Sequence, residues 1–174
     1  RLALLSREAV GRSGLVAGDL SITGQFIRPF GPVPFEEAVE VYKEQVKGLL
    51  EGGVDLFVIE TMTDLQEARA AVIAVKESCS LPICVTMTFD EDGRTLTGTD
   101  PVTALITLQS LGADAVGCNC STGPETMVKF IRQMKPYAKV PLIAKPNAGL
   151  PKLIDGKTVF SMNAAEFGSH VNPL

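Results

Sequence analysis

The sequence predicts an α/β fold in which parallel strands alternate with helices. Short apolar runs alternate with segments of helical spacing, and the runs begin roughly thirty residues apart, the size of a βαβ unit. The joints Gly53-Val54-Asp55-Leu56 and Gly112-Ala113-Asp114-Ala115 connect a helix end to a strand in the same way. This internal repeat indicates a repeated structural unit, so we expect one parallel sheet with its connecting helices.

The composition is that of one globular domain. The chain has 174 residues, 45% hydrophobic and 21% charged, which is enough apolar material for a sizeable core. The net charge of -4 argues against a nucleic-acid or anionic-membrane surface, and no apolar run is long enough to span a membrane. There is no signal peptide and no initiating methionine, so we expect an excised fragment. Four cysteines in a chain of this length favour reduced thiols in a cytoplasmic protein.

The chain begins with a helix, a strand and a second helix. Residues 2–10 have the apolar spacing of a helix, and residues 15–20 form a short apolar run typical of a buried strand. Residues 21–34 are rich in glycine and proline and predict a long loop, of a length that is usually functional. Residues 35–50 separate apolar from charged residues on opposite helical faces, and Gly52-Gly53 ends this helix.

A nearly continuous apolar run follows. Residues 54–59 predict a strand covered on both faces, ending at Glu60-Thr61. Asp64 resembles an N-cap with Glu67 as its partner three residues on, which opens a helix to about Glu77.

The second half continues the alternation. Pro101 and Pro124 suit the first turn of a helix, where the missing N–H is not needed. The expected elements are a strand over 83–89, a turn over 90–94, a helix over 100–111, a strand from 113 that leads to two cysteines, a helix from 124, a strand over 141–145, a polar loop, and a helix that begins at 163 and is cut off at the end of the chain.

Polar residues stand at the end of every predicted strand, namely Asp19, Glu60, Thr88, Asn119, Cys120 and Asn147. An open doubly wound sheet would also fit the alternation, but a barrel is preferred because its strand ends converge on one mouth. Five strands cannot close an eight-stranded barrel. The predicted fold is therefore an incomplete (β/α)8 TIM barrel with three strands missing.

Cys120 is the strongest candidate for chemistry. It lies just before a predicted helix start, where the helix dipole favours a thiolate that can attack or bind zinc. A buried structural thiol is an equally good interpretation. Cys118 lies two residues earlier and would share its side of a strand, but two thiols do not make a zinc site. The single histidine, His170, is expected at the surface.

Two further residues could bind a ligand. Glu60 follows a run of apolar residues, so its carboxylate is expected either to pair with an Arg or Lys or to capture an amine. Asn147 either makes a turn or offers a weakly ligating group at the mouth. Lys145 at a strand end leaves an aldolase-like barrel as another interpretation. No phosphate-binding glycine motif supports a nucleotide.

Four ordered motifs resemble the homocysteine S-methyltransferase family, and within it the homocysteine-binding domains that work with cobalamin. They are Glu51-Gly52-Gly53-Val54-Asp55-Leu56-Phe57-Val58-Ile59-Glu60-Thr61, Gly93-Arg94-Thr95-Leu96-Thr97-Gly98, Gly117-Cys118-Asn119-Cys120-Ser121-Thr122-Gly123-Pro124 and Lys145-Pro146-Asn147-Ala148-Gly149-Leu150-Pro151. The resemblance implies that residues 1–174 form a partial homocysteine-binding barrel domain covering about strands three to seven.

The resemblance also implies a catalytic zinc at the barrel mouth. Cys120 matches one of three zinc thiolates, and the other two belong to a Gly-Gly-Cys-Cys-Gly motif that this chain lacks. Cys118 falls at a variable position and has no implied metal role. Glu60 matches the glutamate that holds the homocysteine amino group, and Asn147 matches an asparagine near the zinc.

The implied reaction is methyl transfer to the thiol of homocysteine, which gives methionine. The expected donor is methylcobalamin charged from methyltetrahydrofolate, with the corrinoid and methyltetrahydrofolate domains of a parent protein as partners. Betaine, S-adenosylmethionine or S-methylmethionine are alternative donors. With one zinc thiolate, the chain alone is expected to be inactive, and a non-catalytic partial barrel is the alternative from another class.

Overall fold

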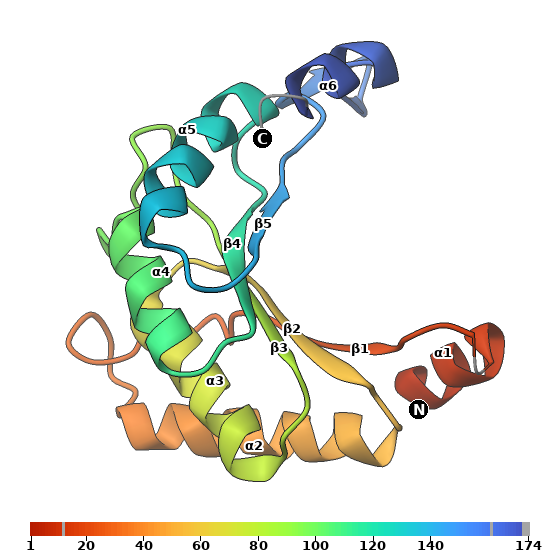
Figure 1. The fold of residues 1–174 in the computed structure, drawn as a ribbon, viewed down its shortest axis with the longest axis vertical. Coiled ribbons are helices and arrows are strands. Elements are labelled where there is room, and N and C mark those ends of the chain that lie inside the picture. The colour runs from red at the N-terminus through yellow and green to blue at the C-terminus, as the bar shows by residue number, and fades with distance from the viewer. Residues whose placement is uncertain (12, 161, 172–174) are drawn as a thin grey trace.

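The computed structural model describes residues 1–11, 13–160 and 162–171 (Figure 1). The elements are α1 (Leu2–Val10), β1 (Ala17–Leu20), α2 (Phe35–Glu51), β2 (Leu56–Met62), α3 (Leu65–Ser78), β3 (Ile83–Met87), α4 (Pro101–Ser110), β4 (Ala115–Asn119), α5 (Pro124–Met134), a 3-10 turn (Lys135–Tyr137), β5 (Leu142–Lys145), β6 (Pro151–Ile154), β7 (Lys157–Phe160) and α6 (Ala164–Val171). The order of strands and helices is the predicted one up to β5.

Strands β1 to β5 form one parallel sheet in chain order. Helices α2, α3, α4 and α5 follow one another around one side of this sheet (Figure 1). A parallel sheet built in chain order with its helices on one side is part of a (β/α)8 barrel, so the predicted fold class is confirmed. No helix of the described residues is long and apolar enough to cross a membrane.

The register separates the two faces of the sheet. Phe57 aligns with Ile83, and Val85 aligns with Val116, and all four side chains are fully buried against the helices. The alternate residues define an inner face, which points away from the helices: Asp19, Val58, Glu60, Cys84, Thr86, Asn119 and Lys145. The apolar core therefore lies between sheet and helices, and the inner face carries the polar groups.

Two aspartates make the repeated joint that the sequence indicates. Asp55 Oδ2 accepts the N–H of Val16 at 2.7 Å, and the Asp55 N–H donates to the Val16 carbonyl at 2.8 Å. Asp114 makes the same two bonds with Ile83, at 2.9 and 2.8 Å. Each joint thus clasps the start of one strand to the start of the preceding strand.

The strand expected over 54–59, with its end at Glu60-Thr61, is found slightly later in the chain, because β2 runs from Leu56 to Met62. The register with β3 shifts between Ile59 and Met62, and Thr61 has a φ of 60°. Such a bulge re-aims side chains at the rim of a sheet. Glu60 and Thr61 therefore belong to the strand rather than following it.

The polar loop expected after β5 is instead a hairpin of β6 and β7. Its turn is Asp155-Gly156, with φ of 50° and 74°, and Asp-Gly is a favoured pair for this type of two-residue turn. The helix expected from Asn163 begins at Ala164. Its expected truncation at Asn172-Pro173-Leu174 lies outside the described residues.

Candidate functional site

The carboxyl ends of β2 and β4 are tied together by Asn119. The Asn119 side chain is 2% exposed, and its Oδ1 accepts the Thr61 N–H at 3.0 Å while its Nδ2 donates to Thr61 Oγ1 at 2.8 Å. Thr88, which follows β3, donates its hydroxyl to the Asn119 carbonyl at 3.1 Å. These bonds bring the ends of three strands together, as the convergence of polar strand ends predicts.

Cys120 leaves β4 at this point. Its φ is 58°, its N–H donates to the Lys145 carbonyl at 3.1 Å, and its Sγ lies 3.2 Å from Asn119 Nδ2. The side chain is half-buried, and α5 begins four residues later at Pro124. The amide of Asn119 therefore orients the sulfur at the mouth, ahead of a helix start.

Cys118 and Cys120 do not act as a pair. Cys118 is 1% exposed among the core side chains between sheet and helices, and burial raises the pKa of its thiol to about 12. The regular alternation that would put both thiols on one side stops at Asn119, because the backbone turns at Cys120. Only Cys120 of these two is placed for chemistry at the mouth.

Glu60 forms an ion pair with Lys145 across the inner face, from β2 to β5. This is the structural partner that the sequence leaves unidentified. Asp19 lies on the same face, and burial followed by the charge of Glu60 raises the pKa of its carboxyl, while Lys145 lowers it. An ammonium group is therefore already held by the Glu60 carboxylate.

Asn147 lies beside the segment that follows Cys120. Its N–H donates to the Thr122 carbonyl at 3.1 Å, two residues beyond the bond from Cys120 to the Lys145 carbonyl. The two chain segments thus run together past the end of the sheet. Glu60, Cys120 and Asn147 therefore lie on one rim. Lys145 connects them, because its side chain pairs with Glu60, its carbonyl accepts the Cys120 N–H, and Asn147 follows two residues later.

The described part of the chain holds no group of three or more His, Cys, Asp and Glu side chains that could bind a metal ion. His170 lies on α6, where its Nε2 is 3.4 Å from Glu125 Oε1 on α5. Zinc needs at least three protein ligands, and Cys120 offers a suitable soft donor. The described residues therefore fit one position of a zinc site and do not complete it.

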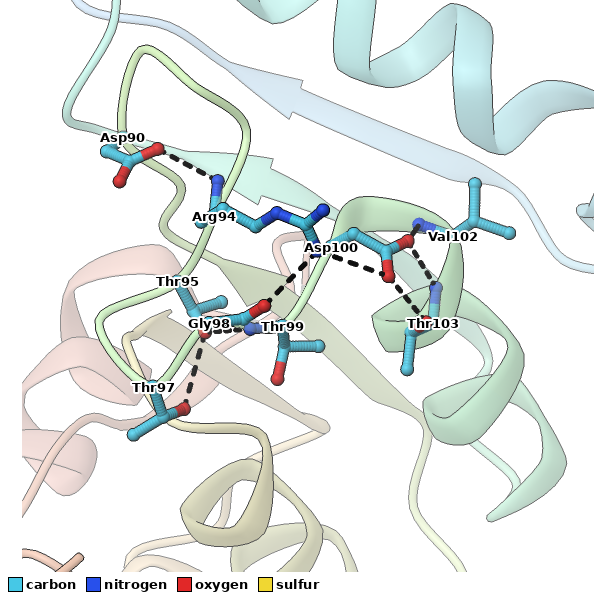
Figure 2. Close-up of polar contacts among 9 residues, drawn as sticks. All are labelled: Asp90, Arg94, Thr95, Thr97, Gly98, Thr99, Asp100, Val102 and Thr103. Atoms are coloured by element: carbon cyan, nitrogen blue, oxygen red, sulfur yellow. Dashed lines mark hydrogen bonds and ion pairs between the residues drawn. The ribbon is translucent and has the colours of Figure 1, made fainter.

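The Gly93-Arg94-Thr95-Leu96-Thr97-Gly98 motif is a folded loop rather than an open turn (Figure 2). Asp90 Oδ1 accepts the Arg94 N–H at 2.9 Å, and the Arg94 side chain reaches the Gly98 carbonyl at 3.3 Å and Asp100 at 3.7 Å (Figure 2). Asp100 then caps α4 through the N–H groups of Val102 and Thr103. The motif is thus braced between β3 and α4.

Asp64 makes the predicted cap of α3, but Glu67 does not complete the predicted capping box. Asp64 caps α3 by accepting the Gln66 N–H at 3.0 Å, as expected. Glu67, 4% exposed, instead accepts the Thr23 N–H and hydroxyl, both at 2.7 Å, and the Tyr42 hydroxyl at 3.0 Å. Burial and then Glu67 raise the pKa of Tyr42 well above its usual range. Sequence reasoning missed this anchor of the loop over 21–34, because its partners are 25 to 44 residues from Glu67.

The sequence pattern of the homocysteine S-methyltransferase family matches residues 1–173. The methionine synthase of Mycobacterium leprae is 33% identical over 135 residues, which cover 75% of this chain. The methionine synthase of Mycobacterium tuberculosis is 34% identical over 119 residues, which cover 66% of this chain. The chain belongs to the homocysteine S-methyltransferase family, as its motifs predict. It spans about a tenth of the length of these curated relatives, 11% and 10%.

Solved structures show the same fold. The homocysteine methyltransferase MmuM of Escherichia coli in its metallated form matches with a TM-score of 0.67 at 22% identity, over 86% of this chain and 54% of that one. Its apo form gives a TM-score of 0.66 with the same coverage. The matched part of this chain therefore shares its fold with about half of the MmuM chain.

Proposed function

We propose that residues 1–174 form a partial homocysteine-binding barrel domain, with about strands three to seven, of an enzyme that methylates the thiol of homocysteine to give methionine. The supporting observation is that Glu60, Cys120 and Asn147, which the family resemblance selects, share one rim of the sheet. Membership of the family supports the same reaction class.

In this proposal each residue has a defined task. Glu60 holds the substrate amino group by charge, Cys120 supplies one of three zinc thiolates, and Asn147 lies beside the metal. Zinc, when bound, lowers the pKa of a thiol so that a thiolate is available at neutral pH. The chain's own contribution is to hold the substrate amine in a fixed place, which lowers the entropic cost of reaching the transition state.

The proposed methyl donor is methylcobalamin charged from methyltetrahydrofolate, delivered by other domains of a cytoplasmic parent protein. The relatives named methionine synthase support this choice over betaine, S-adenosylmethionine or S-methylmethionine. Adding each donor in turn to the full-length protein with homocysteine and measuring methionine distinguishes them. Methionine formed with methylcobalamin alone is the expected result.

We propose that the chain alone is catalytically inactive, because its described residues place a single cysteine, Cys120, at the mouth and hold no group of three or more metal-binding side chains. Elemental analysis of bound zinc in the chain alone and in the full-length protein tests this. One zinc per chain in the full-length protein, lost in Cys120→Ser and kept in Cys118→Ser, is the expected pattern. Zinc that persists in the Cys120→Ser protein would remove Cys120 from the site.

Two alternative functions are each supported by a specific structural feature. A non-catalytic partial barrel would use the outer edges of β1 and β5, which pair with no further strand among the described residues. An aldolase-like barrel would use Lys145 as a Schiff-base lysine, and the ion pair with Glu60 keeps its ammonium engaged. Borohydride trapping of a carbonyl substrate on Lys145 would favour this last alternative over methyl transfer.

A further inference from the structure

A small cavity lies apart from the strand-end site, between the start of α3 and two loops. The loop over 21–34 forms one side, and the loop over 93–98 contributes to another. The cavity has a volume of about 170 Å³, and none of the residues assigned above to substrate or zinc lines it. It is therefore a separate feature of the surface, formed entirely by described residues of this chain.

The start of α3 supplies two carboxylates to this cavity, Asp64 and Glu67, and each is 4% exposed. Asp64 Oδ1 accepts the Gln66 N–H at 3.0 Å and the Thr97 hydroxyl at 3.2 Å, whereas its Oδ2 is buried and has no hydrogen-bond partner. The three hydrogen bonds to Glu67 all reach Oε1, and none from the described part of the chain reaches Oε2. Two buried acceptor oxygens are thus left for a ligand, since a buried carboxylate oxygen without a donor is costly.

No lysine or arginine is among the residues that line this cavity. Arg69, on the next turn of α3, donates to Gln66 and lies 5.4 Å from the centre of the Phe35 ring, so it is already engaged elsewhere. Buried carboxylates are normally paired with a positive group. The charge of the cavity therefore favours a cation.

The walls of the cavity decide which cation fits. Ile22, Phe26 and Leu96 form an apolar wall, and they are 44%, 47% and 70% exposed. A metal ion would need oxygen ligands in place of these hydrocarbon groups. The volume is also below the roughly 300–1,000 Å³ of usual small-molecule sites, so the cavity suits a single side chain.

An arginine side chain complements these features. Its guanidinium carries five N–H donors in a planar fork, which can bond two carboxylates at once, and it stacks on aromatic rings such as that of Phe26. Its aliphatic stem can pack on the apolar wall. A lysine ammonium is a more strongly hydrated point charge and matches the two acceptors less well.

We propose that this cavity binds an arginine side chain of a partner polypeptide, with the guanidinium held between Asp64 and Glu67. Apolar residues of the partner that flank the arginine would rest on the apolar wall. Arginine in a desolvated cavity is a frequent anchor of protein interfaces. This interaction site is independent of the proposed methyl transfer, because it shares no residue with the strand-end site.

Fluorescence anisotropy of two labelled peptides on the full-length protein tests the site. One peptide carries an arginine between two leucines, and the other carries citrulline, which has the shape of arginine without its charge. We expect the arginine peptide to bind about tenfold more tightly, because its hydrogen bonds are charge-assisted. Asp64→Asn should remove most of this preference while keeping the helix cap, since Asn caps a helix as well as Asp does.

Asp100→Asn is the matched control, because Asp100 caps α4 and does not line the cavity. It should leave the preference for arginine unchanged. Leu96→Lys places a competing ammonium group beside the cavity at a position that is 70% exposed, and it should also abolish the preference without unfolding the protein. Circular dichroism melting identifies any variant that fails to fold.

Equal binding of the two peptides to the wild-type protein, or no binding of either, would overturn the proposal. So would an unchanged preference in folded Asp64→Asn or Leu96→Lys protein. Each of these results would leave the proposed methyl transfer standing, because none of these substitutions touches Glu60, Cys120 or Asn147.

Discussion

Asn119 holds Thr61 through both ends of its side-chain amide, at 3.0 and 2.8 Å, across the intervening strand β3. The same amide nitrogen lies 3.2 Å from the sulfur of Cys120. One buried side chain thereby fixes both the bulge of β2 beside Glu60 and the position of the thiol. The strength of this tie is open to direct measurement.

Asn119→Ala removes both bonds to Thr61 and leaves the partly buried Thr61 N–H without its acceptor. We expect the free energy of unfolding to fall by about 1–3 kcal/mol in urea titrations. Thr61→Val removes only the bond to the hydroxyl and should give a smaller loss. If the two variants are equally stable, the tie does not contribute through both ends of the amide.

Gly117→Ala should disrupt the pairing of β4 with β5. A Cβ at Gly117 would lie 1.8 Å from the Ile143 carbonyl oxygen, and backbone on both strands cannot move away easily. We expect a loss of at least about 1–3 kcal/mol in the free energy of unfolding. Gly48→Ala is the matched control, because a Cβ there meets nothing within 4 Å and lies in α2. It should stabilise the protein by about 0.5–1 kcal/mol. Unchanged stability of Gly117→Ala would contradict the close approach of the strands.

The Asp55 joint predicts a specific dependence on pH. The Val16 N–H and then Arg7 hold the pKa of Asp55 below its usual 3.8. A carboxyl whose pKa is lower in the folded state stabilises the fold above about 3.8 and loses that contribution as the pH falls through the folded-state value. Asp55→Asn should therefore be less stable near neutrality and should lose less stability on acidification. If the urea midpoints of the wild-type and Asp55→Asn proteins fall equally between neutral and acidic pH, the Asp55 carboxylate does not stabilise the fold.

Tyr42 anchors the loop over residues 21–34. Its hydroxyl lies 2.9 Å from the Ser21 carbonyl and 3.0 Å from Glu67 Oε1. Tyr42→Phe removes a buried donor to a carboxylate, so we expect a loss of about 1.5–3 kcal/mol and faster hydrogen exchange in the loop. Tyr137→Phe is the control, since Tyr137 is 54% exposed. A loop that exchanges no faster in Tyr42→Phe would show that Tyr42 is not its anchor.

Local patterns in the sequence predict the strands and helices of the sheet, since each depends on apolar periodicity within one segment. The aspartate joints are also visible as a repeated tetrapeptide. The hairpin of β6 and β7 is missed, although Asp155-Gly156 is a usable signal, because all eight residues of its two strands are exposed and show no buried face.

The candidate site is predicted less completely than the fold. Glu60, Cys120 and Asn147 are selected by motif, and their shared rim follows from the parallel sheet. The identity of the Glu60 partner is not predictable, because Lys145 lies 85 residues away and meets it only once the sheet curves. Cys118 is buried and Cys120 is not, because the backbone turns at Cys120, and no residue type at this position predicts that turn.

The two aspartate clasps also bear on how the protein is made. They close loops of 39 and 31 residues and involve only neighbouring strands, so each can form before the rest of the chain exists. Loop-closure entropy grows slowly with length and stays modest for segments of this size. Each clasp can therefore fix the register of its own pair, β1 with β2 or β3 with β4, without waiting for the other pair.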